Sequence, residues 1–171
     1  MTRFPNEVFE VHPCPSGGVT IRLASSGDAR RVWQWRNDPE TRAASFDARP
    51  VPYVDHETWF AVRLSDPATR FYIIVQPEES LVGYVRFALE GDNAVISIAL
   101  DASVRGQGIG TAAIIAGCER VLEEPTVNRV TASVKADNEP SMRAFTKAGF
   151  GLSTGGKSER ESERILEFPP T

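Results

Sequence analysis

Three glycines within six residues mark the stretch of this chain where chemistry is easiest to place. Arg105-Gly106-Gln107-Gly108-Ile109-Gly110 lies between an apolar, β-branched run at 94–100 and a helix-like run at 109–122. Glycines leave backbone N–H groups uncovered, and the first N–H groups of a helix have no partner inside that helix. Together with the helix dipole, these groups attract phosphate. The spacing therefore predicts a pyrophosphate cradle at the start of a helix.

Two common phosphate-binding loops do not fit this stretch. A P-loop ends in Gly-Lys-Ser/Thr, and a dinucleotide-binding fingerprint needs a glycine where this chain has Thr111. The alternative without a ligand is a tight turn built from three glycines. The spacing Arg105-x-x-Gly108-x-Gly110 resembles the acyl-CoA-binding motif of the GNAT superfamily of N-acetyltransferases. That resemblance implies that acetyl-CoA binds along residues 105–111.

A second segment, residues 138–150, resembles a later motif of the same superfamily. Asn138 and Pro140 are typical of a helix start, and Gly149 is typical of a helix end. The segment is therefore predicted to be one short helix with an apolar stripe that packs on the core. The resemblance implies that Asn138 contacts the pantetheine arm or CoA. Two motifs in register are much less frequent by chance than one.

The rest of the chain supplies elements in an order that would position both motifs. Periodicity and breakers predict strands at 20–23, 70–76, 81–89, 94–100, 129–134, 151–154 and 164–168, and helices at 26–37, 55–64, 109–122 and 138–148. This order is that of the superfamily. We therefore expect a single-domain α/β GNAT fold, with a mixed central sheet of about seven strands flanked by about four helices. Residues 1–18 are predicted to be an N-terminal arm before an N-acetyltransferase domain at 19–171.

In the superfamily, the strand before the glycine loop splays from its neighbour and offers a backbone amide to the thioester carbonyl. A backbone N–H aimed at a developing oxyanion is a large catalytic term and needs no particular side chain. The resemblance implies that acetyl-CoA acts as the acetyl donor. It is expected to bind to Ile98, Ala99, Leu100, Arg105, Gly106, Gln107, Gly108, Ile109, Gly110, Thr111, Asn138 and Lys147.

The groups that would move protons depart from a common family pattern. The aromatic position that often carries a tyrosine acid is Phe145 here, and the position of a glutamate base in some ribosomal-protein acetyltransferases is Ser133. His56, at the start of a predicted helix, is the best titratable candidate because a neutral imidazole accepts a proton near pH 7. The alternative for His56 is a surface or capping histidine. Further candidate acids are Tyr53, Tyr72 and Tyr84.

Aromatic and arginine residues gather in segments that would form the acceptor end of the site. Residues 35–42, 56–60, 83–87 and 94–98 resemble nucleotide-sugar N-acetyltransferases of the pseudaminic-acid and related amino-sugar pathways. Arginines grip a diphosphate in bidentate fashion, and a tryptophan stacks on a base or sugar face. The alternative is that arginines pair with local carboxylates and tryptophans pack the core. The predicted acceptor-binding residues are Trp35, Arg36, Asn37, Arg42, Trp59 and Arg86.

Composition narrows the class of protein. The 171 residues carry a net charge of −4, which argues against a general nucleic-acid binder because phosphate backbones attract dense lysine and arginine. No apolar run approaches the length of a membrane-spanning helix. Cys14 and Cys118, the only cysteines, form no disulfide framework or metal-binding spacing. We therefore expect a cytoplasmic protein that uses no metal and binds neither nucleic acid nor membrane.

The residues and the resemblance together predict an acetyl-CoA-dependent N-acetyltransferase. Its expected partner is a small-molecule primary amine, with a nucleotide-linked amino sugar as the preferred acceptor. One alternative is N-terminal or lysyl acetylation of the ribosomal-protein type. Another is a non-catalytic acyl-CoA-binding module, suggested by the absence of a hydroxyl at Phe145 and of a carboxylate at Ser133. The sequence leaves open the identity of the acceptor and whether the protein is a homodimer.

Overall fold

The computed structural model describes residues 18–155, 158 and 160–169. The arm predicted for residues 1–18 lies, except for Gly18, outside the described residues. The elements follow in the order β1 (Thr20–Leu23), η1 (Ser26–Asp28), α1 (Ala29–Asn37), α2 (Pro39–Ala44), α3 (Tyr53–Ser65), β2 (Thr69–Gln76), η2 (Pro77–Glu79), β3 (Ser80–Glu90), β4 (Asn93–Leu100), η3 (Ala102–Val104), α4 (Ile109–Leu122), β5 (Arg129–Lys135), α5 (Glu139–Lys147), β6 (Gly151–Leu152) and β7 (Glu163–Phe168).

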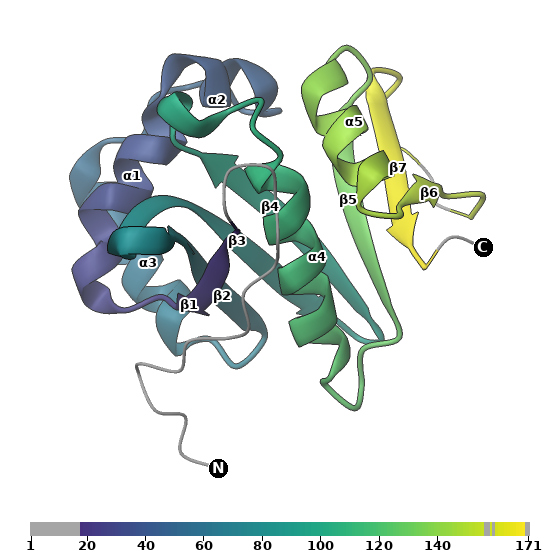
Figure 1. The fold of residues 1–171 in the computed structure, drawn as a ribbon, viewed down its shortest axis with the longest axis horizontal. Coiled ribbons are helices and arrows are strands. Elements are labelled where there is room, and N and C mark those ends of the chain that lie inside the picture. Colours follow the sequence, from purple (N-terminus) through teal and green to yellow (C-terminus); the bar gives the residue numbers. More distant parts are fainter. Residues whose placement is uncertain (1–17, 156–157, 159, 170–171) are drawn as a thin grey trace.

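Seven strands form one mixed sheet in the order β1-β2-β3-β4-β5-β7-β6 (Figure 1). Neighbouring strands are antiparallel, except that β4 and β5 run parallel. The β4–β5 ladder holds only from the pair Asn93–Arg129 to the pair Val95–Thr131. Beyond Val95 the two strands no longer pair with each other. The sheet is therefore parted between them, in agreement with the superfamily resemblance.

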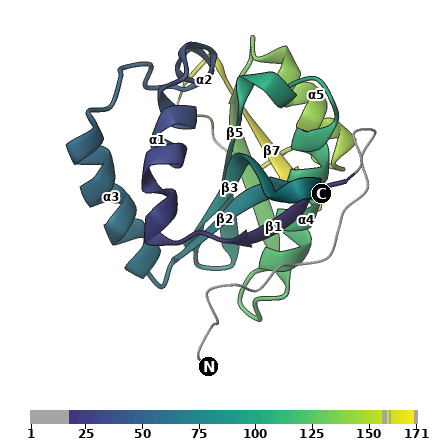
Figure 2. The ribbon, with the colours of Figure 1, turned by 60° about the vertical axis from the view of Figure 1, so that its left-hand side comes forward.

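Helices cover both faces of the sheet, with α4 on one face and α1 and α3 on the other (Figure 2). The strands alternate accordingly. In β3, Val85 and Phe87 belong to the core beneath α4, whereas Tyr84 belongs to the core beneath α1 and α3. A slip of one residue would turn each of these side chains to the wrong face. Burial on both faces thus fixes the register of β3, the antiparallel neighbour of β4.

Two features differ from the sequence prediction. The predicted first helix ends before Pro39, and no helix is predicted directly after it. The structure places Pro39 in the first turn of a further helix, α2, which Asp38 caps by accepting a backbone N–H at 3.0 Å. Proline suits that turn because its missing N–H would have no partner there. Helix α3 begins at Tyr53, two residues before its predicted start, so Asp55 lies in its first turn.

Candidate active site

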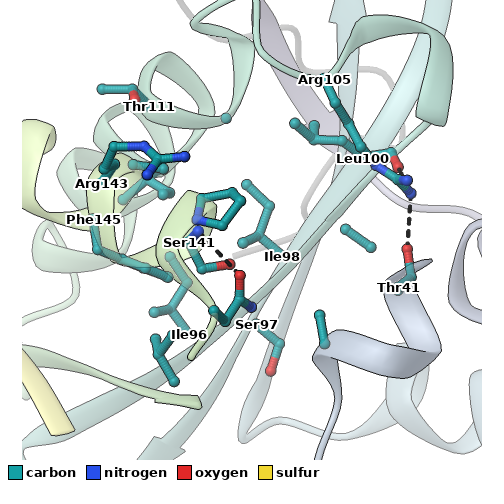
Figure 3. A pocket seen from close by; sticks show the side chains of 18 of the residues that line it. Thr41, Ile96, Ser97, Ile98, Leu100, Arg105, Thr111, Ser141, Arg143 and Phe145 are labelled. Atoms are coloured by element: carbon teal, nitrogen blue, oxygen red, sulfur yellow. Dashed lines mark hydrogen bonds between the residues drawn. The ribbon is translucent and has the colours of Figure 1, made fainter. Parts of the chain in front are cut away.

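A cavity of about 1010 Å³ opens where β4 and β5 part. Its walls come from α2 and the residues after it, the end of β4, the glycine loop with the start of α4, β5, and α5. Figure 3 shows Arg105 and Thr41 on one side of this cavity and Ser141 and Phe145 on the other. The cavity exists because the β4–β5 ladder ends early.

The glycine loop presents backbone donors to this cavity. Gly108 immediately precedes α4, and its φ of 82° lies in the left-handed region that glycine adopts without strain. The first hydrogen bond into the helix runs from Ala112 N to Gly108 O at 3.1 Å. The amides of residues 109–111 have no acceptor among the described residues. They are therefore available to an anion at the helix N-terminus.

The side chain of Arg105 turns toward α2. Its guanidinium donates to the carboxylates of Asp38 and Glu40, each at 2.7 Å, and to the carbonyl oxygen of Leu100 at 3.0 Å. The hydrogen bond from Arg105 holds the pKa of Asp38 below its usual value. Arg105 thus ties α2 to the glycine loop, and two carboxylates already balance its charge.

Helix α5 supplies the wall opposite Arg105. Asn138 lines the cavity and caps α5 by accepting a backbone N–H at 3.3 Å. Arg143 and Lys147 bring positive charge to the same wall. Phe145 also lines the cavity, but it is only 4% exposed and packs edge-on against Phe150 with ring centroids 5.0 Å apart. The wall therefore combines a packed aromatic core with two cations at the cavity.

Among the residues predicted to bind acetyl-CoA, all except Gln107 and Ile109 line the cavity. The Gln107 side chain donates to Ser103 O at 3.1 Å. The Ile109 side chain is buried in the core beneath α4. For Ile109, only the backbone amide at the helix start is placed to meet a ligand.

The amides of β4 alternate between β3 and the opening. Asp101 N donates to Val82 O of β3 at 2.8 Å. Because successive residues of a strand alternate in direction, the amides of Leu100 and Ile98 point to the other edge, which β5 leaves uncovered. The Leu100 carbonyl on that edge accepts from Arg105. The Ile98 N–H is therefore a backbone donor at the cavity.

None of the six residues predicted to bind the acceptor lines the cavity. Trp35 is 3% exposed and donates its Nε1–H to Asp101 at 3.1 Å. Asn37 exchanges two hydrogen bonds, both of 2.8 Å, with the backbone of Val51. In this structure these two side chains hold α1 against the end of β4 and against the loop before α3.

The two arginines of this set near α2 bind backbone oxygens of the same loop. Arg36 donates to Asp47 O at 3.0 Å, and Arg42 donates to Ala48 O at 3.3 Å. Both arginines therefore order the segment between α2 and α3. A direct contact between either guanidinium and a bound acceptor stays a prediction that this geometry does not favour.

Arg86 lies one side chain behind the cavity wall. Its guanidinium packs 5.4 Å from the ring centroid of Trp59, and its Nη2 donates to Ser97 Oγ at 3.2 Å. Burial lowers the pKa of Arg86. Ser97 itself lines the cavity. Arg86 thus reaches the cavity through one hydrogen-bonded serine.

His56 lies in the packing between α1 and α3. It is 3% exposed, its Nε2 is 2.9 Å from Ala29 O, and its ring stacks on Phe60 with centroids 5.6 Å apart. Since a carbonyl only accepts, Nε2 carries the hydrogen. Burial lowers the pKa of the imidazole. His56 does not line the cavity, so its role as a proton acceptor stays a prediction that this geometry does not favour.

The structure also brings residues to the cavity that the sequence does not single out. Helix α2 has a signal in the sequence, since Asp38-Pro39-Glu40 combines a helix cap, a first-turn proline and an acidic residue. Ser97 has none, because one serine in an apolar strand does not reveal which face it occupies. The additional residues on the side of α2 and β4 are Glu40, Thr41, Ala44, Ser45, Phe46, Ile96 and Ser97, and those on the side of α4, β5 and α5 are Ile114, Val134, Pro140, Ser141, Arg143 and Ala144.

Two further observations concern only the part of the chain that the structure describes. No group of three or more histidine, cysteine, aspartate or glutamate side chains is arranged there to hold a metal ion. No helix there is long and apolar enough to cross a membrane.

A sheet parted between two parallel strands, with a glycine-rich helix start at the opening, is the arrangement that the superfamily resemblance predicts. The chain belongs to the acetyltransferase (GNAT) domain family, which it matches over residues 19–151. The predicted GNAT fold is confirmed, with seven strands and with α2 added to the predicted helices.

Relatives come from both curated proteins and solved structures. The chain is 26% identical over 147 residues to a mycothiol acetyltransferase of Sanguibacter keddieii, a match that covers 80% of this chain and 45% of that protein. It therefore spans less than half the length of that relative. An aminoglycoside acetyltransferase in complex with coenzyme A superposes with a TM-score of 0.75 at 21% identity, over 87% of this chain and 93% of the other.

A spermidine N-acetyltransferase from Vibrio cholerae, in complex with CoA and spermine, superposes with a TM-score of 0.74 at 16% identity, over 87% of this chain and 94% of the other. At these identities the solved structures show the fold alone. The comparisons thus support the superfamily resemblance, and they do not show the narrower resemblance to nucleotide-sugar N-acetyltransferases.

Proposed function

We propose that this chain is an acetyl-CoA-dependent N-acetyltransferase that acts on a primary amine of a small molecule. The observation that carries the proposal is the cavity at the parted strands, into which the N-terminus of α4 and the edge of β4 both present backbone N–H groups. Family membership supports the proposal. A cytoplasmic location belongs to the same proposal.

The donor would lie along the glycine loop. Its pyrophosphate would accept from the amides of residues 109–111, where the helix dipole favours negative charge. Lys147 and Arg143 would add positive charge from α5. The pantetheine would pass between the parted strands toward Asn138 and the edge of β4.

At the reacting end, the Ile98 N–H would stabilise the negative charge that develops on the thioester oxygen. The amine attacks the carbonyl carbon, the new C–N bond forms, the C–S bond breaks, and the CoA thiolate leaves with a proton. Phe145 is placed where a hydroxyl would be useful, but it can only pack. The thiolate would therefore take its proton from the attacking nitrogen, directly or through water.

For the acceptor, the coarse proposal is a small, amine-bearing molecule. Solved neighbours carry the names of aminoglycoside and spermidine acetyltransferases, and these names support that class. The finer proposal, a nucleotide-linked amino sugar, is supported by the positive charge of Arg86 behind Ser97. A peptide N-terminus or lysine is the alternative acceptor, and a non-catalytic acyl-CoA-binding module is the alternative class.

One assay separates these functions. Purified protein is incubated with acetyl-CoA and a panel of kanamycin, spermidine, a uridine-diphosphate amino sugar and N-terminal peptides, and CoA release is measured. Release with one of the small amines is the expected result. CoA release only with peptides would show that the acceptor is a peptide amine and not a small molecule. Tight acetyl-CoA binding by calorimetry without release by any amine would establish the binding module and overturn the enzyme proposal.

A further inference from the structure

Two serines line the cavity on the face of the sheet that α2 covers. In β5, Val130, Ala132 and Val134 belong to the core beneath α4, so Ser133, which alternates with them, points to the other face. Lys135 shares that face and donates to a carbonyl oxygen of α2 at 2.8 Å. Ser97 of β4 also lines the cavity and alternates with core residues in the same way.

The two serines are held by opposite charges. Ser97 Oγ accepts from the Arg86 guanidinium at 3.2 Å, which leaves the Ser97 hydrogen to be donated elsewhere. Ser133 Oγ donates to Glu163 Oε1, which leaves the Ser133 lone pairs to accept. A hydroxyl has one donor and two acceptor positions, so each serine presents a different polarity to the cavity. The β5 side is the one suited to an ammonium group.

Proton acceptors are scarce in the described lining of the cavity. That lining contains one carboxylate, Glu40, and no histidine. Glu40 is engaged by Arg105 at 2.7 Å, and its side chain is 80% exposed. The Ser133–Glu163 contact therefore offers the other route from the cavity to a carboxylate. Glu163 is brought there by pairing opposite Lys135 in the β5–β7 ladder.

We propose that Glu163, acting through Ser133, takes the proton that the acceptor amine must lose before it attacks. The ammonium nitrogen gives its proton to Ser133 Oγ, and Ser133 gives its own hydrogen to the Glu163 carboxylate. The products are a neutral amine and a carboxylic acid, which returns the proton to solvent after transfer. The inference rests on the proposed N-acetyltransferase function. It places the general base on β7, whereas the position of the glutamate base in some ribosomal-protein acetyltransferases is Ser133 of β5.

Among the described residues, the charged groups near Glu163 are three cations and the exposed carboxylate of Glu161. Lys135 lies opposite it on β5, Arg164 follows it in β7, and Arg160 precedes it and packs over Phe46 on the α2 side. Ser158 Oγ lies 3.2 Å from Glu163 Oε2. Wild type and Glu163→Gln differ in this one carboxylate, so the pH dependence of their difference in kcat reports on how the amine loses its proton.

The test compares Glu163→Gln with wild type, using the amine that the wild type acetylates best. Glutamine keeps an oxygen that accepts from Ser133 but takes up no proton, so the fold and the acetyl-CoA affinity should not change. The expected kcat at pH 7 falls roughly 100-fold, a typical weight for a general base. The loss should shrink as the pH rises, because the amine then loses its proton to solvent. Ser133→Ala should show the same pH-dependent loss.

Glu161→Gln is the matched control, since Glu161 is exposed in the same segment and its side chain makes no bond to a described residue. It should retain wild-type kcat, and Glu163→Asp should recover part of the activity. Wild-type activity in Glu163→Gln, or a loss that is equal at every pH, would overturn the proton route while the N-acetyltransferase proposal stands. If the wild type acetylates no amine in the panel, both proposals fail.

Discussion

The two halves of the cavity are built by different means. The half formed by the glycine loop, the start of α4 and the edge of β4, here the donor half, presents mainly backbone amides from residues close in sequence. The half formed by α2, residues 45–46, Ser97 and Ser133, here the acceptor half, presents side chains from elements far apart in sequence. The Arg105 guanidinium joins them through Asp38 and Glu40.

This difference explains why the amino-acid sequence reveals one half and conceals the other. Backbone recognition leaves a mark in the sequence, because glycine takes the conformation required at Gly106 and Gly108, with φ of 74° and 82°, without the strain that other residues meet there. Side-chain recognition leaves no such mark, because a serine or arginine serves many roles and its neighbours are decided by long-range packing. The donor half should therefore be sensitive to backbone changes and the acceptor half to changes of charge.

The largest effect is expected from Gly108→Val, which tests whether the donor half works through its backbone. A β-branched residue at φ 82° is strained, and its side chain would lie at the phosphate cradle. Acetyl-CoA affinity measured by calorimetry should fall about 100-fold or more, which corresponds to roughly 3 kcal/mol. Gly110→Val tests the cradle without backbone strain, since Gly110 has no positive φ. Its added Cβ would instead press on Leu100 Cδ1, at 3.3 Å.

Gly155→Val serves as the control, because a Cβ there meets nothing within 4 Å and its φ is not positive. It should leave both affinity and thermal stability unchanged. Unchanged affinity in Gly108→Val and Gly110→Val, with both proteins folded, would mean that the cradle is assigned to the wrong amides.

Much of the fold follows from the sequence for the same reason as the donor half. Helix α4 has the predicted bounds, Ile109–Leu122, because a glycine loop and an apolar face define it locally. β1 also has its predicted bounds, Thr20–Leu23. The sequence prediction misses helix α2, because it takes Pro39 only as the end of α1 and not as the start of a new helix. Local signals thus give elements, and they give boundaries less well where two helices adjoin.

The acceptor half could not be predicted, because the sequence does not show which polar side chains bind other parts of the protein and which face the cavity. Trp35 donates a hydrogen bond to Asp101, which follows β4, and Asn37 donates one to the backbone of Val51. Both side chains are of types suited to a ligand, and both bind the protein instead. Glu163 reaches Ser133 only because β7 pairs with β5. Such contacts depend on which strands pair in the sheet, and that pairing cannot be inferred from the types of the residues alone.

A second prediction separates packing from chemistry at Phe145 of α5, in the wall opposite Arg105. Phe145→Ala should lower the free energy of unfolding by roughly 3 kcal/mol, because it empties a buried site against Phe150. Chemical denaturation measures the change. Phe145→Tyr should keep that stability and leave kcat near or slightly above wild type. A steep loss of kcat in a stable, acetyl-CoA-binding Phe145→Leu protein would show that the ring does more than pack.

A third prediction tests the link between the halves. The Arg105 hydrogen bond lowers the pKa of Asp38 in the folded protein, so the stability it contributes is present above the unfolded pKa near 3.9 and is lost as the pH falls through the folded value. Asp38→Asn keeps a capping oxygen for α2 but not the charge. Denaturation at pH 6 should show a loss of roughly 1 kcal/mol, allowing for solvent screening, and the difference from wild type should shrink as the pH falls and the Asp38 carboxylate of the wild type takes up a proton.

Acetyl-CoA affinity of Asp38→Asn should stay within about twofold of wild type, because the amides of the cradle do not depend on α2. A difference in stability that persists at low pH would mean that Asp38 acts through its shape and not through its charge.

The smallest effect is expected from substitutions of Arg86 and Arg36, which the sequence predicts in one acceptor site and which the structure places in two different environments. Arg86 reaches the cavity through Ser97, whereas Arg36 binds Asp47 O in the loop before α3. If the acceptor carries phosphate, Arg86→Met should raise its KM about 3- to 10-fold, the weight of roughly 1 kcal/mol of charge interaction. The effect should shrink as salt rises, and the KM of acetyl-CoA should not change. Arg36→Ala should instead lower the melting temperature and leave both KM values near wild type.

If the two variants raise the acceptor KM equally, the arginines do form one anionic subsite and the loop contact of Arg36 gives way when the acceptor binds. If neither changes it, and a neutral amine is acetylated as fast as any phosphate-bearing one, the nucleotide-sugar acceptor is excluded and Arg86 serves the packing of Trp59.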